Sequence, residues 1–464
     1  MDLFICVLAL GVLILLAYRG FSVILVAPLA AMLAVLLTEP LAVAPAYTGL
    51  FMDKLATFVK LYFPVFLLGA VFGKLIEVSG AASSIASRIS QSLGANHAIF
   101  AVTAMGMILT YGGVSVFVVV FATYPFAAEM FRQANIPKRL LPATIALSAF
   151  TVTMDALPGT PQIQNIIPTT FFKTDAYAAP ILGISAALFT SVLCLLYLQW
   201  QARRASARGE GYGHDHRNEP DGSREANDMS LWLALAPLAV VGIANRLILW
   251  TIENSLRGTS AVTWSPSTTL TVAQYVKANA ALWSVEAALL LGILTTLVIG
   301  WKAIRPKFAV ASQTAVSGAL LAGLNTASEY GFGAVIAVLP GFYQIAAALS
   351  TIRDPLLNAS LTTTILCGIT GSASGGLSLT LGAFADRFIA SAAANGIPPE
   401  VMHRITALAS GGMDTLPHNG AIITLLAVTG LTHREAYKDI FAITIVKTLA
   451  VFVAIAVFYG TGLV

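Results

Sequence analysis

Charged residues are scarce in this chain of 464 residues. Lysine, arginine, aspartate and glutamate make up only 10% of it, whereas soluble domains carry roughly 25%. Hydrophobic residues make up 57%, and the mean hydropathy is +0.81. Apolar runs of about 20 residues, the length that crosses a bilayer as a helix, recur along the chain. This composition excludes a soluble globular protein and predicts an all-α polytopic membrane protein.

Cysteines are equally sparse, and the common catalytic motifs are missing. The three cysteines, Cys6, Cys194 and Cys367, lie in separate apolar runs and support neither a disulfide framework nor a metal site. The chain contains no Walker motif, no His-Glu-x-x-His pattern and no Gly-x-Ser-x-Gly pattern. We therefore expect no enzyme activity, no cofactor or metal, and no nucleic-acid partner. A channel or an intramembrane enzyme that uses His403, Asp414 and His418 is the less favoured alternative.

Two polar stretches interrupt apolar segments in matching ways. The first, at residues 151–165, includes Met154-Asp155-Ala156-Leu157-Pro158-Gly159-Thr160-Pro161, and the second contains Met413-Asp414-Thr415-Leu416-Pro417. Proline removes a backbone donor and glycine weakens helical order, so each stretch predicts a broken helix. Within a membrane such breaks are tolerated only where protein or a water-filled cavity satisfies the backbone. Paired breaks in corresponding places indicate the binding site of a transporter.

The two breaks belong to a longer internal repeat. Gly112-Gly113-Val114-Ser115 matches Gly375-Gly376-Leu377-Ser378, Asn135-Ile136-Pro137 matches Gly396-Ile397-Pro398, and a weaker echo pairs Glu77 with Glu329. The matches occur in one common order and need only small gaps, so they indicate an internal duplication.

The predicted organisation follows from this repeat. Residues 1–200 form the first half, 201–230 a charged and Gly-rich linker on the cytoplasmic side, and 231–464 the second half. In each half an interrupted apolar segment predicts a re-entrant hairpin, at about 97–131 and 356–391, although one or two ordinary spans would also fit the first. The broken helices are expected at about 142–170 and 405–428. Within the linker, we interpret His214-Asp215-His216 as part of a flexible solvated tract and not as a metal site.

The positive residues predict the orientation. If ten segments cross the membrane fully and two hairpins do not, most basic loops fall on one side, which is the cytoplasm. These loops contain Arg19, the 132–139 turn, the 203–224 linker, Lys302 to Lys307, and Arg434 with Lys438. The same count places 391–404, the repeat partner of the 132–141 turn, outside. The halves are therefore predicted to have opposite orientations, as an inverted repeat.

Inversion would bring both hairpin tips and both breaks together near the middle of the membrane. Helix N-termini there could hold an anion with neutral donors, because no lysine or arginine lies at either tip or break. The candidate substrate-binding residues are Gly112, Gly113, Ser115, Thr160, Gln162, Asn165, Ser374, Gly375, Ser378, Thr415 and Asn419. For each hydroxyl, simple packing between helices is an equally good explanation.

Asp155, Asp414 and His418 are the candidates for ion or proton coupling. A carboxylate inside a span is costly and indicates function, although either aspartate could instead cap the half-helix after the break. A histidine in a break could relay protons. Glu77 and Glu329 are interpreted as interfacial or structural residues, because both are expected close to helix ends.

One stretch carries a family resemblance. The sequence from Gly69 to Ala82, GAVFGKLIEVSGAA, the Asn-x-Pro turn before the Pro-rich break, and the chain length together resemble the gluconate:proton symporter (GntP) family of the ion-transporter superfamily. This resemblance implies a proton-coupled importer of a small hydroxy-carboxylate in the bacterial inner membrane. It also implies a homodimer in which each subunit has a scaffold and a moving, elevator-like transport domain. Gluconate-type members carry a His- and Pro-rich break, so a 3-hydroxybutyrate-like acid is as good an expectation as gluconate. Sodium coupling stays open.

Overall fold

The computed structural model describes residues 2–19, 21–94, 97–114, 116–214, 216–219, 229–255, 262–265, 268–270, 272–342, 344, 351–417 and 419–464. Within these ranges the protein is helical, apart from one antiparallel pair of strands in the loop expected at 251–280. The strands are β1 (Val262–Ser265) and β2 (Thr268–Leu270). The expectation of an all-α membrane protein is confirmed, with this small hairpin as an addition.

The first half contains the elements that the sequence predicts, with somewhat longer helices. In order, they are α1 (Asp2–Tyr18), α2 (Val23–Thr38), η1 (Pro40–Ala42), α3 (Val43–Pro45), η2 (Ala46–Phe51), α4 (Met52–Val78), α5 (Ala81–Leu93), α6 (Ala98–Tyr111), α7 (Val116–Gln133), η4 (Lys138–Leu140), α8 (Leu141–Ala149), η5 (Val152–Ala156), α9 (Ile163–Phe172) and α10 (Pro180–Ala207).

The elements of the second half are α11 (Leu231–Ser255), β1, β2, α12 (Val272–Ile304), η6 (Arg305–Lys307), α13 (Phe308–Ala337), α15 (Pro355–Thr370), α16 (Ala373–Ala394), α17 (Pro399–Gly412), α18 (Gly420–Thr429) and α19 (His433–Thr461). Both halves contain a long helix, a helical hairpin, a broken helix and a final long helix in this order, and the first half also has α5 before its hairpin. The internal duplication itself stays a prediction.

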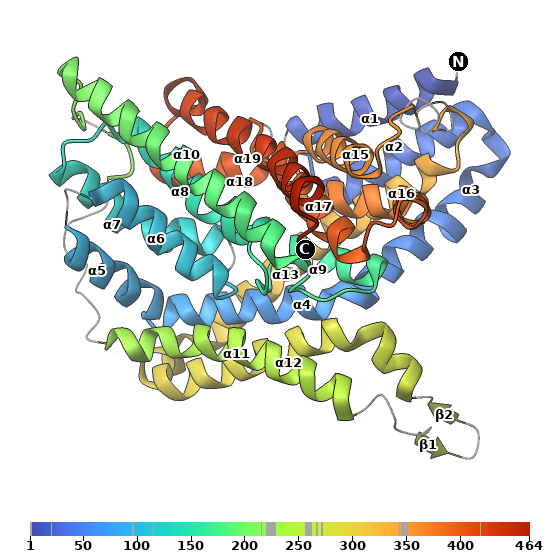
Figure 1. Ribbon diagram of the computed structural model, residues 1–464, viewed down its shortest axis with the longest axis horizontal. Coiled ribbons are helices and arrows are strands. Elements are labelled where there is room, and N and C mark those ends of the chain that lie inside the picture. Colours follow the sequence, from blue (N-terminus) through green and yellow to red (C-terminus); the bar gives the residue numbers. More distant parts are fainter. Residues whose placement is uncertain are drawn as a thin grey trace.

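The packing follows the same correspondence. The long helices α4 and α13 pack against each other, and so do the final helices α10 and α19. In addition, α12 packs on α4 just as α2 packs on α13. Figure 1 shows α4, α11 and α12 side by side along one edge of the molecule, with the hairpins and broken helices above them. The two halves therefore interlock and do not form separate lobes.

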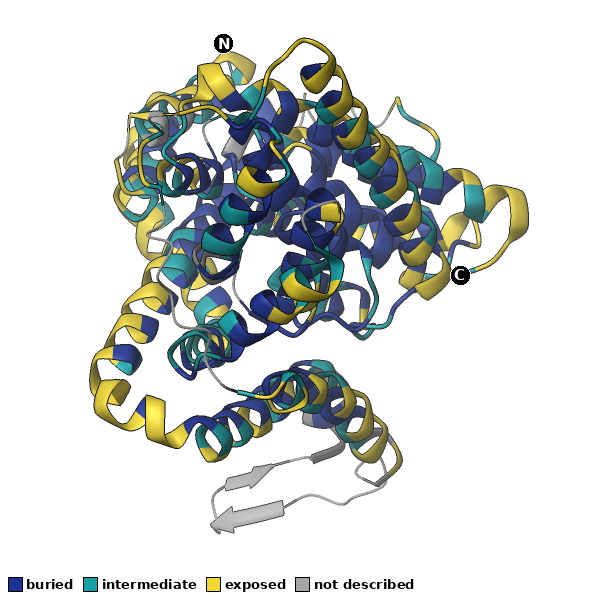
Figure 2. Cartoon of the chain, turned by 90° about the vertical axis from the view of Figure 1, so that its left-hand side faces the viewer, coloured by how far each residue is buried: buried dark blue, intermediate teal, exposed yellow. Residues whose placement is uncertain are grey.

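Apolar side chains cover much of the surface. Large hydrophobic residues on the outer faces of peripheral helices are exposed, among them Leu29 on α2, Leu188 on α10 and Val298 on α12. In Figure 2 the buried residues gather inside the bundle, and the exposed ones lie on the outward faces of its helices. Six described segments are long and apolar enough to span a membrane, one of which joins α12 and α13. The protein is a multi-pass membrane protein, and the count of ten crossings stays a prediction.

The described part of the linker is docked onto the protein. Lys138, on the turn before α8, has a fully buried side chain that donates to Glu219 Oε1 at 2.7 Å and to Arg217 O at 3.0 Å. Beside it, Arg139 bonds both Glu210 and Asp439 of α19. The expectation of a flexible tract is therefore wrong for the described residues up to Glu219. Linker residues 215 and 220–228 lie outside the described part.

Candidate functional site

The first break begins where α8 ends at Ala149. The chain makes the π-helical turn η5, which contains Asp155, then turns at Leu157 to Gly159 and continues without regular structure to Gln162 before α9 starts. Gly159 has a φ of +82°, a conformation that other residues adopt only at a cost. The freed backbone groups find partners, as a broken helix in a membrane requires, because Gly159 N donates to Ala176 O at 2.8 Å.

The second break is built on the same plan. Helix α17 ends at Gly412, the chain passes through Asp414 and Pro417, and α18 begins after Asn419. The Asn419 side chain caps α18 by accepting from Ala421 N at 2.7 Å and Ile422 N at 3.2 Å. Residue 418, one of the candidate coupling residues, lies outside the described part.

Each break is tied to the hairpin tip of its own half by the amide residue that precedes the second half-helix. Gln162 Nε2 donates to Thr110 O at 2.8 Å and to Val114 O at 3.2 Å, at the end of α6. Asn419 Nδ2 donates to Gly371 O at 2.7 Å, at the end of α15. Each break therefore contacts the tip of its own half, and the meeting of both tips with both breaks at one place stays a prediction. Both amides satisfy helix-terminal carbonyl groups, so their direct role in substrate binding stays a prediction.

The two aspartates meet around one lysine of α19. Lys447 Nζ donates to Asp414 Oδ1 at 2.6 Å and to Phe150 O at 2.7 Å, which joins the second break to the start of the first. Asp155 lies beside them, because a Cβ added at Gly411 would overlap Asp155 Oδ2 and lie 3.4 Å from Lys447 Cε. Lys447, Asp414 and Asp155 are all at most 5% exposed. Asp155 Oδ2 has no hydrogen-bond partner among the described atoms.

A second buried cation, Arg404, supports the first break from behind. Its guanidinium donates to Ala178 O at 2.8 Å, to Asp155 O at 3.2 Å and to Asn165 Oδ1 at 3.0 Å. Asn165 also donates to Thr160 O and Ala176 O, and its oxygen faces His403 Nε2 at 3.3 Å. Every polar atom of the Asn165 side chain is thus engaged within the protein, which indicates that it holds the break together.

Lys447 and Arg404 are the residues that the sequence analysis missed. The expectation of a site without cations is wrong, because both cations reach the breaks from other helices. Lys447 could have been identified from the sequence, because a lysine inside an apolar span is as costly as an aspartate and therefore also indicates function. Arg404 was interpreted as a residue at the end of an external loop, but it lies inside α17 with no exposed surface.

The remaining candidate substrate-binding residues lie at the two hairpin tips and in the second break. In the first tip, a Cβ at Gly112 would overlap Leu238 of α11, and Gly113 has a φ of +91°, so both glycines are explained by packing and turn geometry. Ser115 lies outside the described residues. In the second tip, Ser378 Oγ donates to Ser374 O at 2.7 Å, and Ser374 Oγ lies 3.4 Å from Thr326 Oγ1. In the second break, Thr415 Oγ1 pairs with Thr444 Oγ1 at 2.6 Å.

The placement of Glu329 close to a helix end is wrong. It lies within α13, which continues to Ala337, and it is 4% exposed. A Cβ at Gly375, in the first turn of α16, would overlap Glu329 Oε2. Glu77, by contrast, lies next to the end of α4 in a half-exposed ion pair with Lys74 at 2.8 Å.

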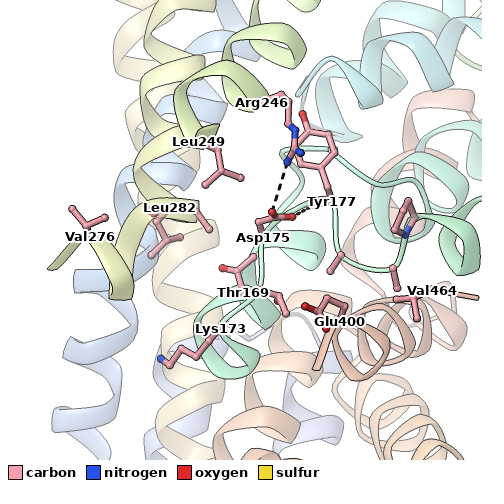
Figure 3. Close-up of a pocket in the computed structure, with 16 residues that line it drawn as sticks. Thr169, Lys173, Asp175, Tyr177, Arg246, Leu249, Val276, Leu282, Glu400 and Val464 are labelled. Atoms are coloured by element: carbon pink, nitrogen blue, oxygen red, sulfur yellow. Dashed lines mark hydrogen bonds and ion pairs between the residues drawn. The ribbon is translucent and has the colours of Figure 1, made fainter. Parts of the chain in front are cut away.

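A cavity of about 1060 Å³ opens behind the first break. It lies between the loop that follows α9 and the helices α11 and α12, and Figure 3 shows Arg246 over the ring of Tyr177 and directed at Asp175. The Arg246–Asp175 separation is 3.9 Å. Burial raises the pKa of Tyr177 to about 12, so its hydroxyl stays protonated and donates to Gly242 O at 3.3 Å. Ala178 lines the cavity, and its carbonyl oxygen accepts a hydrogen bond from Arg404. Because Arg404 also donates to Asp155 O, its guanidinium lies between the cavity and Asp155.

Comparisons with known proteins identify a permease. The family model described as GntP family permease matches residues 1–316. The uncharacterized transporter YxjC of Bacillus subtilis (strain 168) is 52% identical over 481 residues, which cover 100% of both chains. The solved structure of the Alcanivorax borkumensis YdaH transporter has a TM-score of 0.51 at 16% identity, covering 92% of this chain and 90% of that one. Neisseria gonorrhoeae MtrF, of a class of antimetabolite efflux pumps, gives 0.54 at 14% identity, with 88% and 82% covered.

Proposed function

This chain belongs to the GntP family of permeases, and we propose that it is a secondary active transporter that imports a small hydroxy-carboxylate together with protons. The single observation that carries the proposal is the buried group formed by Asp155, Asp414 and Lys447 where the two breaks meet. Ionisable groups inside a membrane protein are costly and mark ion or proton pathways. Asp155 Oδ2, a buried carboxylate oxygen with no hydrogen-bond donor among the described atoms, is a place where a proton can bind and leave.

The alternating-access movement is part of the same proposal. In an inverted repeat, the equivalent helices of the two halves approach a shared site from opposite sides of the membrane. In the layer of α4, α11 and α12, α12 packs on α4, and α2 packs on α13 in the same way. We assign these helices to the scaffold. The hairpins and broken helices would then form the transport domain of an elevator, and two copies of the chain would form a homodimer.

A small hydroxylated monocarboxylate fits the chemistry around the breaks. Helix termini supply N–H groups for a carboxylate, and Ser374, Thr326 and Thr415 supply hydroxyls. A sodium-coupled carrier of an organic anion would use the same helix termini and hydroxyl groups. The test must therefore distinguish sodium coupling from proton coupling.

The test is uptake into proteoliposomes of purified protein. Labelled gluconate and 3-hydroxybutyrate should accumulate when the lumen is alkaline and the bath acidic, without sodium, and a protonophore should abolish the accumulation. Protein-free liposomes give the background. A strict requirement for sodium would refute proton coupling and leave the carrier assignment standing, whereas flux that never exceeds equilibrium would indicate a channel.

A further inference from the structure

Glu329 is a buried acid to which the proposed transport mechanism assigns no role. It is 4% exposed, and its Oε2 has no hydrogen-bond partner among the described atoms. Asn325 Oδ1, four residues earlier and so on the same helix face, also lacks a partner. A buried carboxylate oxygen without a partner among the described atoms, lying beside a hairpin tip, indicates that a ligand or a proton binds at this place.

The tip that Glu329 faces is the N-terminus of α16, a helix of 22 residues. The Ser372 side chain caps it by accepting from Gly375 N at 3.0 Å. Because Gly375 has no side chain, Glu329 Oε2 can lie directly against this first turn. Helix N-termini carry partial positive charge and unpaired N–H groups, so the Glu329 carboxylate occupies a place where an anion would bind.

The charges nearby single out Glu329. At the breaks, Asp155 and Asp414 are accompanied by the cations Lys447 and Arg404. No charged side chain of the described residues on α2, α4 or α16, which pack against α13, acts on Glu329. Cys367 of α15 is a titratable group within electrostatic reach of Glu329 and also of Asp414, Lys447 and Asp155.

We propose that Glu329 couples one proton to each substrate anion at the N-terminus of α16. When ionised, Glu329 holds the helix terminus itself; when a proton binds Oε2, it yields the terminus to the carboxylate of the substrate. The proton comes from solution, stays on Oε2 during transport and returns to solution on the other side. One proton on Glu329 and one monovalent anion together leave the charge at this helix terminus unchanged. This inference rests on the proposed function.

The experiment measures binding of gluconate and of 3-hydroxybutyrate to purified protein by calorimetry, from pH 6 to pH 9. For the wild type, one linked proton makes affinity fall by about tenfold per pH unit once Glu329 ionises. Calorimetry in buffers of different ionisation enthalpy should then show proton uptake on binding. Glu329→Gln mimics the protonated acid, so its affinity should be flat with pH and its proton uptake lower by one. It should still exchange substrate but no longer accumulate it.

Glu77→Gln is the matched control, because it removes the repeat counterpart at a half-exposed position; it should behave as the wild type. If Glu329→Gln does not fold, Glu329→Asp, which keeps a carboxyl group, should retain the pH dependence. Wild-type pH dependence in Glu329→Gln, or its loss in Glu329→Asp, overturns the assignment of Glu329 alone. A wild type that binds without proton uptake refutes this inference and proton coupling together.

Discussion

Replacing Lys447 by methionine should destabilise the protein by more than any surface substitution on the same helix. The lysine and Asp414 are 5% and 4% exposed and lie 2.6 Å apart. Removal of one partner leaves a buried charge uncompensated, which costs about 3–5 kcal/mol. Methionine keeps most of the side-chain volume, so the loss is mainly electrostatic. The hydrogen bond to Phe150 O is lost as well, which loosens the joint between the two breaks.

Thermal unfolding in detergent, followed with a thiol-reactive dye, measures this effect, because the thiols of Cys6, Cys194 and Cys367 are all buried and become reactive on unfolding. Lys438→Met, at an exposed position of α19, is the control and should change stability by no more than about 0.5 kcal/mol. The double variant Lys447→Met/Asp414→Asn removes both charges and should recover part of the loss, with a coupling energy of about 0.5–3 kcal/mol. If Lys447→Met unfolds like the control, the pair is not ionised in the folded protein and the reasoning fails.

The remaining predictions concern coupling, topology and the linker. Asp155→Asn should keep substrate exchange but lose proton-driven accumulation, because asparagine caps a helix about as well as aspartate but carries no titratable proton. Normal accumulation in both Asp155→Asn and Asp414→Asn would show that both carboxylates are structural. A single cysteine at Ser206 should be protected from an impermeant thiol reagent in intact cells, and one in the loop between α11 and α12 should react; the reverse pattern would overturn the orientation. The hydrogen bond from Arg139 lowers the pKa of Glu210, so linker docking is fully present above the ordinary glutamate pKa of about 4.3 and is lost as the pH falls through the lower folded-state value. Since the pair is partly exposed, it should contribute only about 0.2–1 kcal/mol and weaken in salt, and limited proteolysis of the linker with an acid-active protease between about pH 5 and pH 3 would detect the release.

The breaks and hairpins could be predicted because their causes are local. Proline and glycine act on the residues next to them, so the sequence alone places the breaks within a few residues of where the structure has them. The placement of Glu329 close to a helix end was wrong, because α13 continues through Gly331 and Gly333. These glycines serve close packing: a Cβ at Gly331 would lie 2.9 Å from Phe51 O, and one at Gly333 would lie 3.2 Å from Leu379 Cα.

The charge partners could not be predicted, because they depend on tertiary packing. Lys447 reaches Asp414 across 33 residues and Phe150 across 297, and Arg404 reaches Asp155 across 249. No local pattern encodes these pairings. The sequence has no lysine or arginine within the tips and breaks themselves, so it predicts neutral donors there, whereas tertiary packing brings two cations to the breaks.

The two halves share a framework but differ in chemistry, and this difference bears on coupling. The framework is common: an amide residue ties each break to its hairpin tip, and the long helices pack in matching pairs. The acids differ: Asp414 has a direct ammonium partner, whereas Asp155 Oδ2 has no hydrogen-bond partner among the described atoms. Likewise, Glu77 is paired at a half-exposed position, whereas Glu329 is buried against a helix terminus. An inverted repeat would expose one site to both sides of the membrane, and the proposed proton coupling then depends on the two acids that differ from their counterparts, Asp155 and Glu329.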